Sequence, residues 1–148
     1  MNNIPNETLV KFGFPATAVA EYDRWVVLVR PKQVTLGSLL LVCRDDATAF
    51  SDICAEAFAE LGEVVADVEA NLRREVAYEK LNYLMLMMVD PNVHFHVIPR
   101  YQGSRRLRGI EYRDSAWPGP PDLKATTDLT AEELEALTSH LRDAWIRR

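Results

Sequence analysis

The chain is most informative over the stretch Asn92-Val93-His94-Phe95-His96-Val97-Ile98-Pro99-Arg100, where polar and apolar residues alternate. Successive side chains of a β-strand point to opposite faces, so this alternation predicts a strand whose polar residues all share one face. His94 and His96 would then stand about 6 to 7 Å apart along the strand. The valines and the phenylalanine between them would hold the other face against a core, which makes the strand a rigid support for two imidazoles.

The segments before this strand have their own patterns. Apolar, β-branched runs at 25–30 and 38–43, separated by Pro31 and Gly37, predict a β-hairpin. Between 49 and 76 apolar residues recur at spacings of three and four, which predicts one long amphipathic helix with Thr48 as its N-cap. The nearly continuous apolar run 81–89 predicts a strand that is buried on both faces.

After the histidine strand, residues 103–121 are rich in glycine and proline and predict loops packed against the sheet. Residues 131–146 predict a closing helix that opens with a capping box of Thr130 and Glu133. Its buried stripe consists of Leu134, Leu137, Leu141 and Trp145. The order of elements predicts an α+β fold in which an antiparallel β-sheet carries one long amphipathic helix and a C-terminal helix, as a single domain over 1–148.

Composition narrows the class of protein. The chain has 148 residues, 48% of them hydrophobic and 26% charged, which is typical of one globular domain and excludes a disordered tail. The formal net charge of -5 argues against nucleic acid as a partner. No apolar run approaches the roughly 18 residues of a membrane span, and the first residues do not resemble a secretory signal. Two isolated cysteines, Cys43 and Cys54, fit a reducing cytoplasm.

Three interpretations of the two histidines stay open at this level. They can be polar positions on a solvated sheet face. They can share a metal, although no further Cys, His or carboxylate stands at a spacing that suggests a third ligand. One of them can be a nucleophile towards phosphorus, since a neutral imidazole needs no activation near pH 7, while the other contacts the reacting oxygens and Arg100 supplies charge.

The run from Pro91 to Arg100 resembles the signature of the histidine triad (HIT) superfamily, His-x-His-x-His followed by two apolar residues and often Pro-Arg. The likeness extends over most of the chain from about Trp25. It includes the hairpin with Gly37 in its loop, the long middle helix, the strand with Lys80-Leu81-Asn82, and the later Asp114-Ser115-Ala116-Trp117-Pro118. Members of this superfamily are hydrolases and transferases of nucleotides, and bacterial members are the most similar in order and spacing.

The resemblance implies a role for each matching residue. His94 takes the place of the middle histidine, which attacks the α-phosphorus and carries a transient nucleotidyl group. His96 takes the third place, beside the phosphate or the leaving oxygen. The first place holds Asn92, whose amide can both donate and accept a hydrogen bond and so share the task of orienting its neighbour. Ser38, where many members have His, and the run 87–91 also depart from the family pattern.

Further matching positions imply nucleotide contacts. Leu28 and Arg30 fall beside the base and the ribose, although for Arg30 a solvated surface position is preferred to a ligand contact. Asn82 is matched to the phosphate or ribose, with a structural bond to a neighbouring loop as the alternative. His140 on the last helix is expected at the exposed surface. The methionines at 85, 87 and 88 are expected to pack in the core or at a dimer contact.

Together these features predict a cytoplasmic enzyme. It would cleave a phosphoanhydride or phosphoramidate bond at a nucleoside α-phosphate, as a diadenosine polyphosphate hydrolase does. No cofactor is required, although Mg²⁺ could accompany a polyphosphate substrate. The resemblance implies a homodimer paired through the sheet and the long helix, with no nucleic acid and no membrane as partner. The alternatives are a catalytically impaired nucleotide-binding module and a metal-binding sheet protein.

Overall fold

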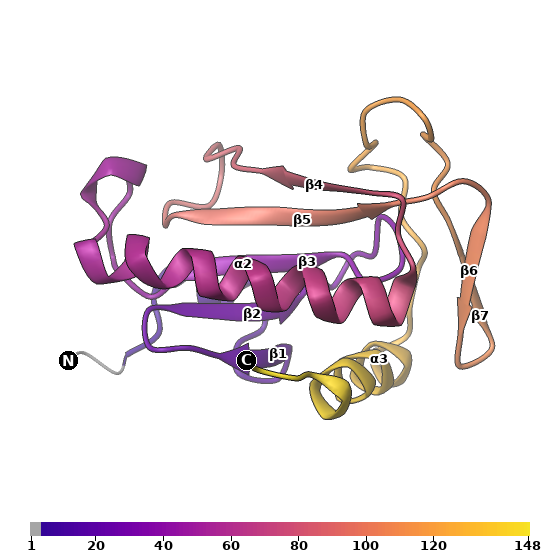
Figure 1. The fold of residues 1–148 in the computed structure, drawn as a ribbon, viewed down its shortest axis with the longest axis horizontal. Helices are drawn as coiled ribbons and strands as arrows, with labels where there is room; N and C mark the ends of the chain where they lie inside the picture. Colours follow the sequence, from indigo (N-terminus) through magenta and orange to yellow (C-terminus); the bar gives the residue numbers. More distant parts are fainter. Residues whose placement is uncertain (1–3) are drawn as a thin grey trace.

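The computed structural model describes residues 4–148, so the first three residues of the predicted domain 1–148 lie outside the described part. Its centre is a five-stranded antiparallel sheet with the strand order β1-β2-β3-β5-β4 (Figure 1). The strands are β1 (Ala18–Glu21), β2 (Trp25–Val29), β3 (Leu39–Cys43), β4 (Lys80–Leu84) and β5 (His94–Arg100). The α+β fold predicted from the sequence, with an antiparallel sheet, a long helix and a C-terminal helix, is confirmed.

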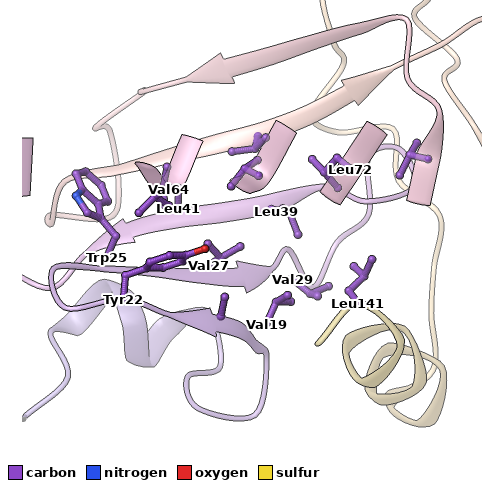
Figure 2. Close-up of a cluster of buried hydrophobic side chains, with 14 of the residues drawn as sticks. Val19, Tyr22, Trp25, Val27, Val29, Leu39, Leu41, Val64, Leu72 and Leu141 are labelled. Carbon is purple, nitrogen blue, oxygen red and sulfur yellow. The ribbon is translucent and has the colours of Figure 1, made fainter. Parts of the chain in front are cut away.

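Helix α2 (Ala55–Val76) lies across one face of this sheet and closes the main core (Figures 1 and 2). Figure 2 shows Val64 and Leu72 of α2 above Val27, Leu39 and Leu41 of the strands. The indole of Trp25 is fully buried and donates to the carbonyl of Ala57 at 2.8 Å, which ties β2 to the start of the helix.

The loop between β2 and β3 approaches the other end of α2 closely. Gly37 has φ +85°, and a Cβ placed there would lie 2.8 Å from Cγ2 of Val76 and 3.1 Å from Cδ2 of Leu72. Any larger residue would therefore be strained in conformation and would push the hairpin away from the helix. This contact fixes the loop that precedes β3.

The opposite face of the sheet is covered by the N-terminal segment, which the sequence patterns did not predict as structured. Helix α1 (Glu7–Lys11) begins after Asn6, whose side-chain oxygen accepts from the backbone N–H of Leu9 at 3.0 Å. Leu9, Phe12 and Phe14 form a second apolar cluster with residues of the sheet, namely Ala18, Val26, Leu28, Leu40 and Val42. A helix of five residues is too short to produce a recognisable hydrophobic period.

Helix α3 (Ala131–Ala144) packs beside β1, at one edge of the sheet (Figure 1). Nε and Nη2 of Arg142 donate to the carbonyls of Ala18 and Ala16 at 2.8 and 3.2 Å. Arg147 donates to the carbonyl of Glu21 at 3.0 Å. Backbone acceptors along the β1 edge are therefore already bonded to side chains.

The segment 103–121 contains a feature that its composition did not predict, a separate hairpin of β6 (Ser104–Leu107) and β7 (Ile110–Arg113). Arg108 and Gly109 at its tip have φ +50° and +81°. Two successive positive φ values are the mark of the tight turn that matches the twist of an antiparallel pair. The loop prediction for this segment is therefore wrong over the two strands.

Two predicted boundaries are also wrong. The long helix does not begin at 49 with Thr48 as its cap. A short turn η1 (Phe50–Asp52) comes first, and α2 begins after Cys54, whose backbone N–H donates to the Asp45 carboxylate at 2.9 Å. The strand predicted over 81–89 ends at Leu84, and Met87, three residues later, has φ +52°, which is incompatible with an extended strand. The residues of β4 are half-buried or exposed, and the strand pairs only with β5, so the predicted burial on both faces is wrong. Met88, beyond the strand, is 84% exposed, so its predicted place in the core is also wrong.

The predicted capping box is confirmed. The Thr130 hydroxyl accepts from the Glu133 N–H at 3.1 Å, and the Glu133 carboxylate accepts from the Thr130 N–H at 2.9 Å. We expect Thr130→Ala to lower the free energy of unfolding by about 1 kcal/mol, since it leaves one first-turn N–H without a partner. Urea denaturation followed by circular dichroism measures this loss, and Thr130→Ser, which keeps the hydroxyl, is the control. Equal loss in both variants would contradict the capping role.

No helix within residues 4–148 combines the length and the apolar character needed to cross a bilayer.

Candidate active site

The two histidines of β5 lie on the sheet face that α1 covers. His94 is paired with Val42 and His96 with Leu40 across β3, and paired residues of neighbouring strands share a face. Their ring centroids are 5.3 Å apart, and the residues are only 2% and 7% exposed. The predicted alternation is confirmed, because Val93 and Val97 point into the core under α2. A fully solvated position for the histidines is excluded by their burial.

The imidazole of His94 is oriented by the backbone. Its Nδ1 lies 2.7 Å from the carbonyl oxygen of Asn92. A carbonyl can only accept, so Nδ1 must carry the proton and Nε2 keeps its lone pair. Among residues 4–148, Nε2 of His94 has no hydrogen-bond partner. This ring is therefore held in the tautomer that a nitrogen nucleophile requires.

The imidazole of His96 is held in the opposite tautomer. Nε of Arg30, the residue that follows β2, lies 3.3 Å from its Nδ1. A guanidinium can only donate, so Nδ1 of His96 must accept and the proton must reside on Nε2. The two neighbouring rings thus differ in what they offer at Nε2, a lone pair on His94 and an N–H on His96.

The protonated form of His96 is also disfavoured. Burial lowers the pKa of His96 to about 4, with further lowering from the charge of Arg30 and from the neighbouring His94, while the carboxylate of Asp90 acts in the opposite direction. At neutral pH this imidazole is therefore uncharged. It can donate a hydrogen bond through Nε2, but it does not hold a proton that it can readily give away.

Asn92 connects three segments around the site. Its side-chain oxygen accepts from the Thr8 N–H at 3.1 Å, and its own N–H donates to the Thr8 hydroxyl at 3.0 Å. Its side-chain Nδ2 donates to the carbonyl of Asp46 at 3.2 Å. The amide therefore binds α1 and the loop after β3 to the start of β5, and it is the backbone carbonyl of Asn92 that orients His94.

These contacts lead to a prediction for Asn92. We expect Asn92→Ala to lower the free energy of unfolding by about 1 to 3 kcal/mol, because it leaves the buried Thr8 N–H and the Asp46 carbonyl without this partner. The backbone carbonyl remains, so Nδ1 of His94 should stay protonated. Denaturant unfolding measures the first effect and ¹⁵N NMR of the histidine rings the second. Loss of the His94 tautomer would show that the side chain, not the backbone, orients the ring.

The N-terminal segment covers both imidazoles. The ring centroid of Phe12 lies 6.2 Å from that of His94 and 6.3 Å from that of His96, edge-on to the latter. Lys11 forms an ion pair with Asp90, which links α1 to the loop before β5. An open groove of about 490 Å³ runs past these two residues and is also lined by Glu7, Val10, Val89 and Pro91. No sequence pattern predicted that the N-terminal segment covers the histidines.

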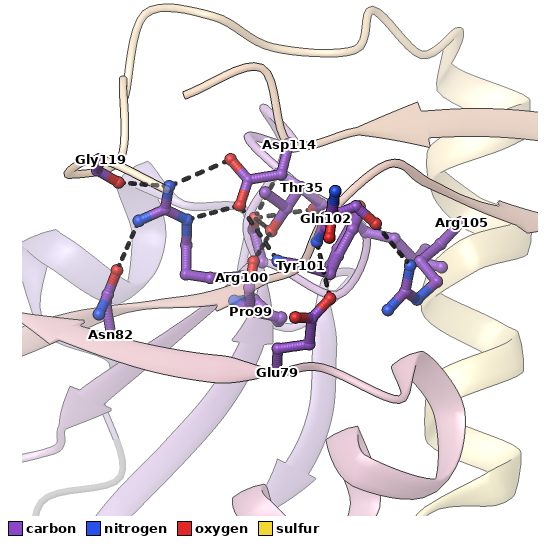
Figure 3. A network of polar contacts seen from close by, with 12 residues as sticks. Thr35, Glu79, Asn82, Pro99, Arg100, Tyr101, Gln102, Arg105, Asp114 and Gly119 are labelled. Carbon is purple, nitrogen blue, oxygen red and sulfur yellow. Dashed lines mark hydrogen bonds and ion pairs between the residues drawn. The ribbon is translucent and has the colours of Figure 1, made fainter. Parts of the chain in front are cut away.

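Figure 3 shows Arg100 and Asn82 bound to each other. Arg100 is four positions after His96 on β5, about 13 Å along the strand, and Asn82 of β4 is paired with Ile98, two residues from His96. Within residues 4–148 no hydrogen bond joins either side chain to the histidines. Nε and Nη2 of Arg100 bind the two carboxylate oxygens of Asp114 at 2.7 and 3.2 Å, Nη1 donates to Asn82 at 2.9 Å, and Nη2 also donates to the Gly119 carbonyl at 2.7 Å. This guanidinium is 4% exposed and its charge is already matched.

The other residues singled out in the sequence differ in how far the structure agrees with their predicted positions. Leu28 is fully buried under the N-terminal segment, in the same row as Leu40 and His96. Arg30 is half-buried against His96, so a solvated surface position is wrong for it. His140 is also not free at the surface, because its Nε2 lies 2.6 Å from the Glu75 carboxylate. Residues 4–148 contain no group of three or more His, Cys, Asp or Glu side chains arranged to hold a metal ion.

Comparisons with known proteins place this geometry in context. A family model described as HIT domain matches residues 11–103. A histidine triad protein from Bradyrhizobium japonicum is similar in structure, with a TM-score of 0.71 and 26% identity over 95% of this chain and 96% of that one. A comparison with curated proteins finds no significant match.

Two further solved structures share the fold at lower identity. A histidine triad (HIT) protein from Sinorhizobium meliloti gives a TM-score of 0.70 at 20% identity, over 95% of this chain and 96% of that one. A diadenosine triphosphate hydrolase from Plasmodium falciparum, solved in complex with cyclomarin A, gives a TM-score of 0.60 at 12% identity, over 87% of this chain and 76% of that one.

Proposed function

Because the chain belongs to the HIT domain family, we propose that it is a nucleotide hydrolase or transferase that works through a covalent intermediate on His94. The bond cleaved is a phosphoanhydride or phosphoramidate at a nucleoside α-phosphate. The observation that carries the proposal is the hydrogen bond between Nδ1 of His94 and the Asn92 carbonyl. It leaves the lone pair of Nε2 available to phosphorus.

The proposed reaction has two displacements. In the first, Nε2 of His94 forms a bond to the α-phosphorus, and the bond from phosphorus to the leaving group breaks with its electron pair on the leaving atom. A phosphate leaves as an anion, whereas an amine leaving group also takes up a proton from solvent. The ring then carries a positive charge, which the Asn92 carbonyl stabilises through Nδ1–H. In the second, water attacks the phosphorus, the P–N bond breaks, and the released proton passes to solvent. The products are the nucleoside monophosphate and the free leaving group.

The neighbours of His94 have proposed roles in the same reaction. His96 presents Nε2–H, which is suited to a hydrogen bond with a phosphate or leaving-group oxygen. We propose that Asn92 fills the first place of the triad and maintains the position of β5 by its bonds to Thr8 and Asp46. Leu28 remains a predicted contact of the base, and because the N-terminal segment covers it fully, a nucleoside would reach it only if that segment moves. Arg100 and Asn82 remain predicted nucleotide contacts, and a nucleotide that reached Arg100 would have to compete with Asp114.

We propose a cytoplasmic homodimer. Two features support pairing through β4 and the long helix, namely the position of β4 at the edge of the sheet and the exposed apolar side chains after it, Leu86, Met88 and Val89. Exposed apolar side chains that gather at a sheet edge are typical of an interface. No cofactor takes part in the covalent step as proposed, and Mg²⁺ would enter only with a polyphosphate substrate.

The test is product release, measured by chromatography, from adenosine and guanosine phosphoramidates and from dinucleoside polyphosphates. Release of nucleoside monophosphate together with a trapped nucleotidyl-protein adduct would support the proposal. Nucleotide binding without any product would favour the alternative of a catalytically impaired binding module, with Asn92→His as the first variant to examine. Metal that survives dialysis and binds at the two histidines would favour a metal protein instead.

A further inference from the structure

We propose that Arg30 fixes His96 as a neutral Nε2–H donor, and that this makes the site selective for substrates whose leaving group departs as an anion. The preferred substrates would then be phosphoanhydrides, such as dinucleoside polyphosphates, over phosphoramidates. This inference rests on the proposed function and specifies its substrate class. Arg30 would be a positioning residue, since it acts on the substrate through His96.

The geometry that carries the inference is a contact between residues far apart in the chain. Arg30 follows directly after β2 and projects on the same sheet face as Leu28, two residues earlier, which brings its Nε to within 3.3 Å of Nδ1 of His96. Its Nη1 donates to the Lys32 carbonyl at 2.6 Å, so the guanidinium is held from two sides. A fixed guanidinium is a donor only, and it therefore excludes the tautomer of His96 with a proton on Nδ1.

The groups around His96 also favour its neutral form. Arg30 faces it from the end of β2 and His94 from β5, and both oppose a positive charge on the ring. The only nearby carboxylate, among residues 4–148, is Asp90 before β5, and Lys11 of α1 is paired with it. Burial together with these charges lowers the pKa of His96 to about 4. A neutral ring at pH 6 to 8 is the consequence.

A neutral imidazole treats the two substrate classes differently. When the bond to a phosphoanhydride oxygen breaks, the departing phosphate carries the electron pair as a stable anion and needs no proton. When a P–N bond of a phosphoramidate breaks, the electron pair stays on an amine nitrogen, which must be protonated to leave. General acid catalysis contributes about 10² to 10⁴-fold to such a step, and a neutral Nε2–H does not supply it. The site therefore favours the anionic leaving group.

The first experiment measures the tautomer and the pKa of His96 directly. ¹⁵N NMR of the full chain in wild type and Arg30→Met should show the bare nitrogen of His96 at Nδ1 in the wild type and no titration of the ring above pH 5. In the variant we expect a mixture of tautomers and a raised pKa of His96 that stays below its usual value, since burial still opposes the charge. Arg30→Lys keeps the charge without the planar fork and should retain the low pKa while losing the fixed tautomer.

The second experiment measures the selectivity between phosphoanhydride and phosphoramidate substrates. At pH 6, kcat/KM is measured for a dinucleoside polyphosphate and for an adenosine phosphoramidate with wild type, Arg30→Met and Lys32→Met. We expect the ratio of anhydride to amidate to fall at least about tenfold in Arg30→Met, because part of His96 can then act as an acid. Lys32→Met removes an exposed positive charge two residues away and should leave the ratio and the His96 spectrum unchanged.

The outcomes separate the two proposals. An unchanged ratio and an unchanged His96 spectrum in Arg30→Met would overturn the role of Arg30 even in an active enzyme. A changed spectrum with an unchanged ratio would overturn the selectivity. If the wild type releases no nucleotide from either substrate, the proposed function fails and the selectivity with it, while the spectrum still decides whether Arg30 sets the tautomer.

Discussion

Replacement of His94 by alanine is expected to lower kcat/KM for the release of nucleoside monophosphate by at least about 10³-fold. The variant lacks the Nε2 atom that forms the bond to phosphorus, and no other histidine in the site has a free lone pair there. His96 carries a proton on Nε2, and its lone pair on Nδ1 is occupied by Arg30. Steady-state release measured by chromatography gives the loss, and acid quenching of the wild type with labelled substrate shows whether a nucleotidyl adduct forms.

His96→Ala is the matched control, because it removes the neighbouring imidazole from the same strand. We expect a smaller loss of about 10 to 100-fold, since a hydrogen-bond donor to phosphate oxygens can be partly replaced by water. The adduct should still form in His96→Ala and be absent in His94→Ala. Equal losses in the two variants would contradict the roles assigned here. Nucleotide affinity retained in both would show that the fold of the site is intact.

The second large effect concerns stability. We expect Asp114→Asn to lower the free energy of unfolding by about 3 to 5 kcal/mol, because it leaves the buried guanidinium of Arg100 without its counter-charge. For a chain of this size the melting temperature should fall by roughly 10 °C. Figure 3 shows why the effect is not local, since Arg100 joins β5, the Asn82 side chain of β4 and the loop at Gly119. Thermal unfolding followed by calorimetry measures it.

Two further variants separate burial from charge. Glu111→Gln breaks exposed ion pairs with Arg106 and Arg113, each of which is worth less than about 1 kcal/mol at the surface. The double variant Arg100→Met with Asp114→Leu removes both buried charges and should recover much of the lost stability. If Asp114→Asn were no worse than Glu111→Gln, the buried pair would not support the sheet.

The fold could be predicted from the sequence because its main elements have strong periods. The hairpin, the long helix and the strand of the two histidines all bury one face, and burial produces the alternation or the spacing that a sequence displays. The end of β4 could not be predicted in this way. The apolar run after Leu84 continues without change, and only the left-handed conformation at Met87 and the exposure of Val89, 80%, show that the strand has ended.

The site was predictable in part. His94 and His96 share a face because of the period of a strand, which is local information. The partners that set their protons are not local. Arg30 lies 66 residues before His96 in the chain, and Phe12 directly follows a helix that is too short to show a pattern. Arg100 shares the face of the histidines by the same period, but its charge is matched by Asp114, whose position depends on the path of the chain after β7 (Ile110–Arg113).

The two edges of the central sheet differ in whether they can accept another strand. At β1, Arg142 and Arg147 donate to the carbonyls of Ala18 and Glu21, and α3 lies alongside. At β4, no described strand pairs on the outer side. A sheet with a single open edge can be joined once by a second copy through the same edge, and the resulting ten-stranded sheet exposes only blocked edges. Growth by strand addition would stop at two subunits, so the edge that permits a pair also excludes a filament.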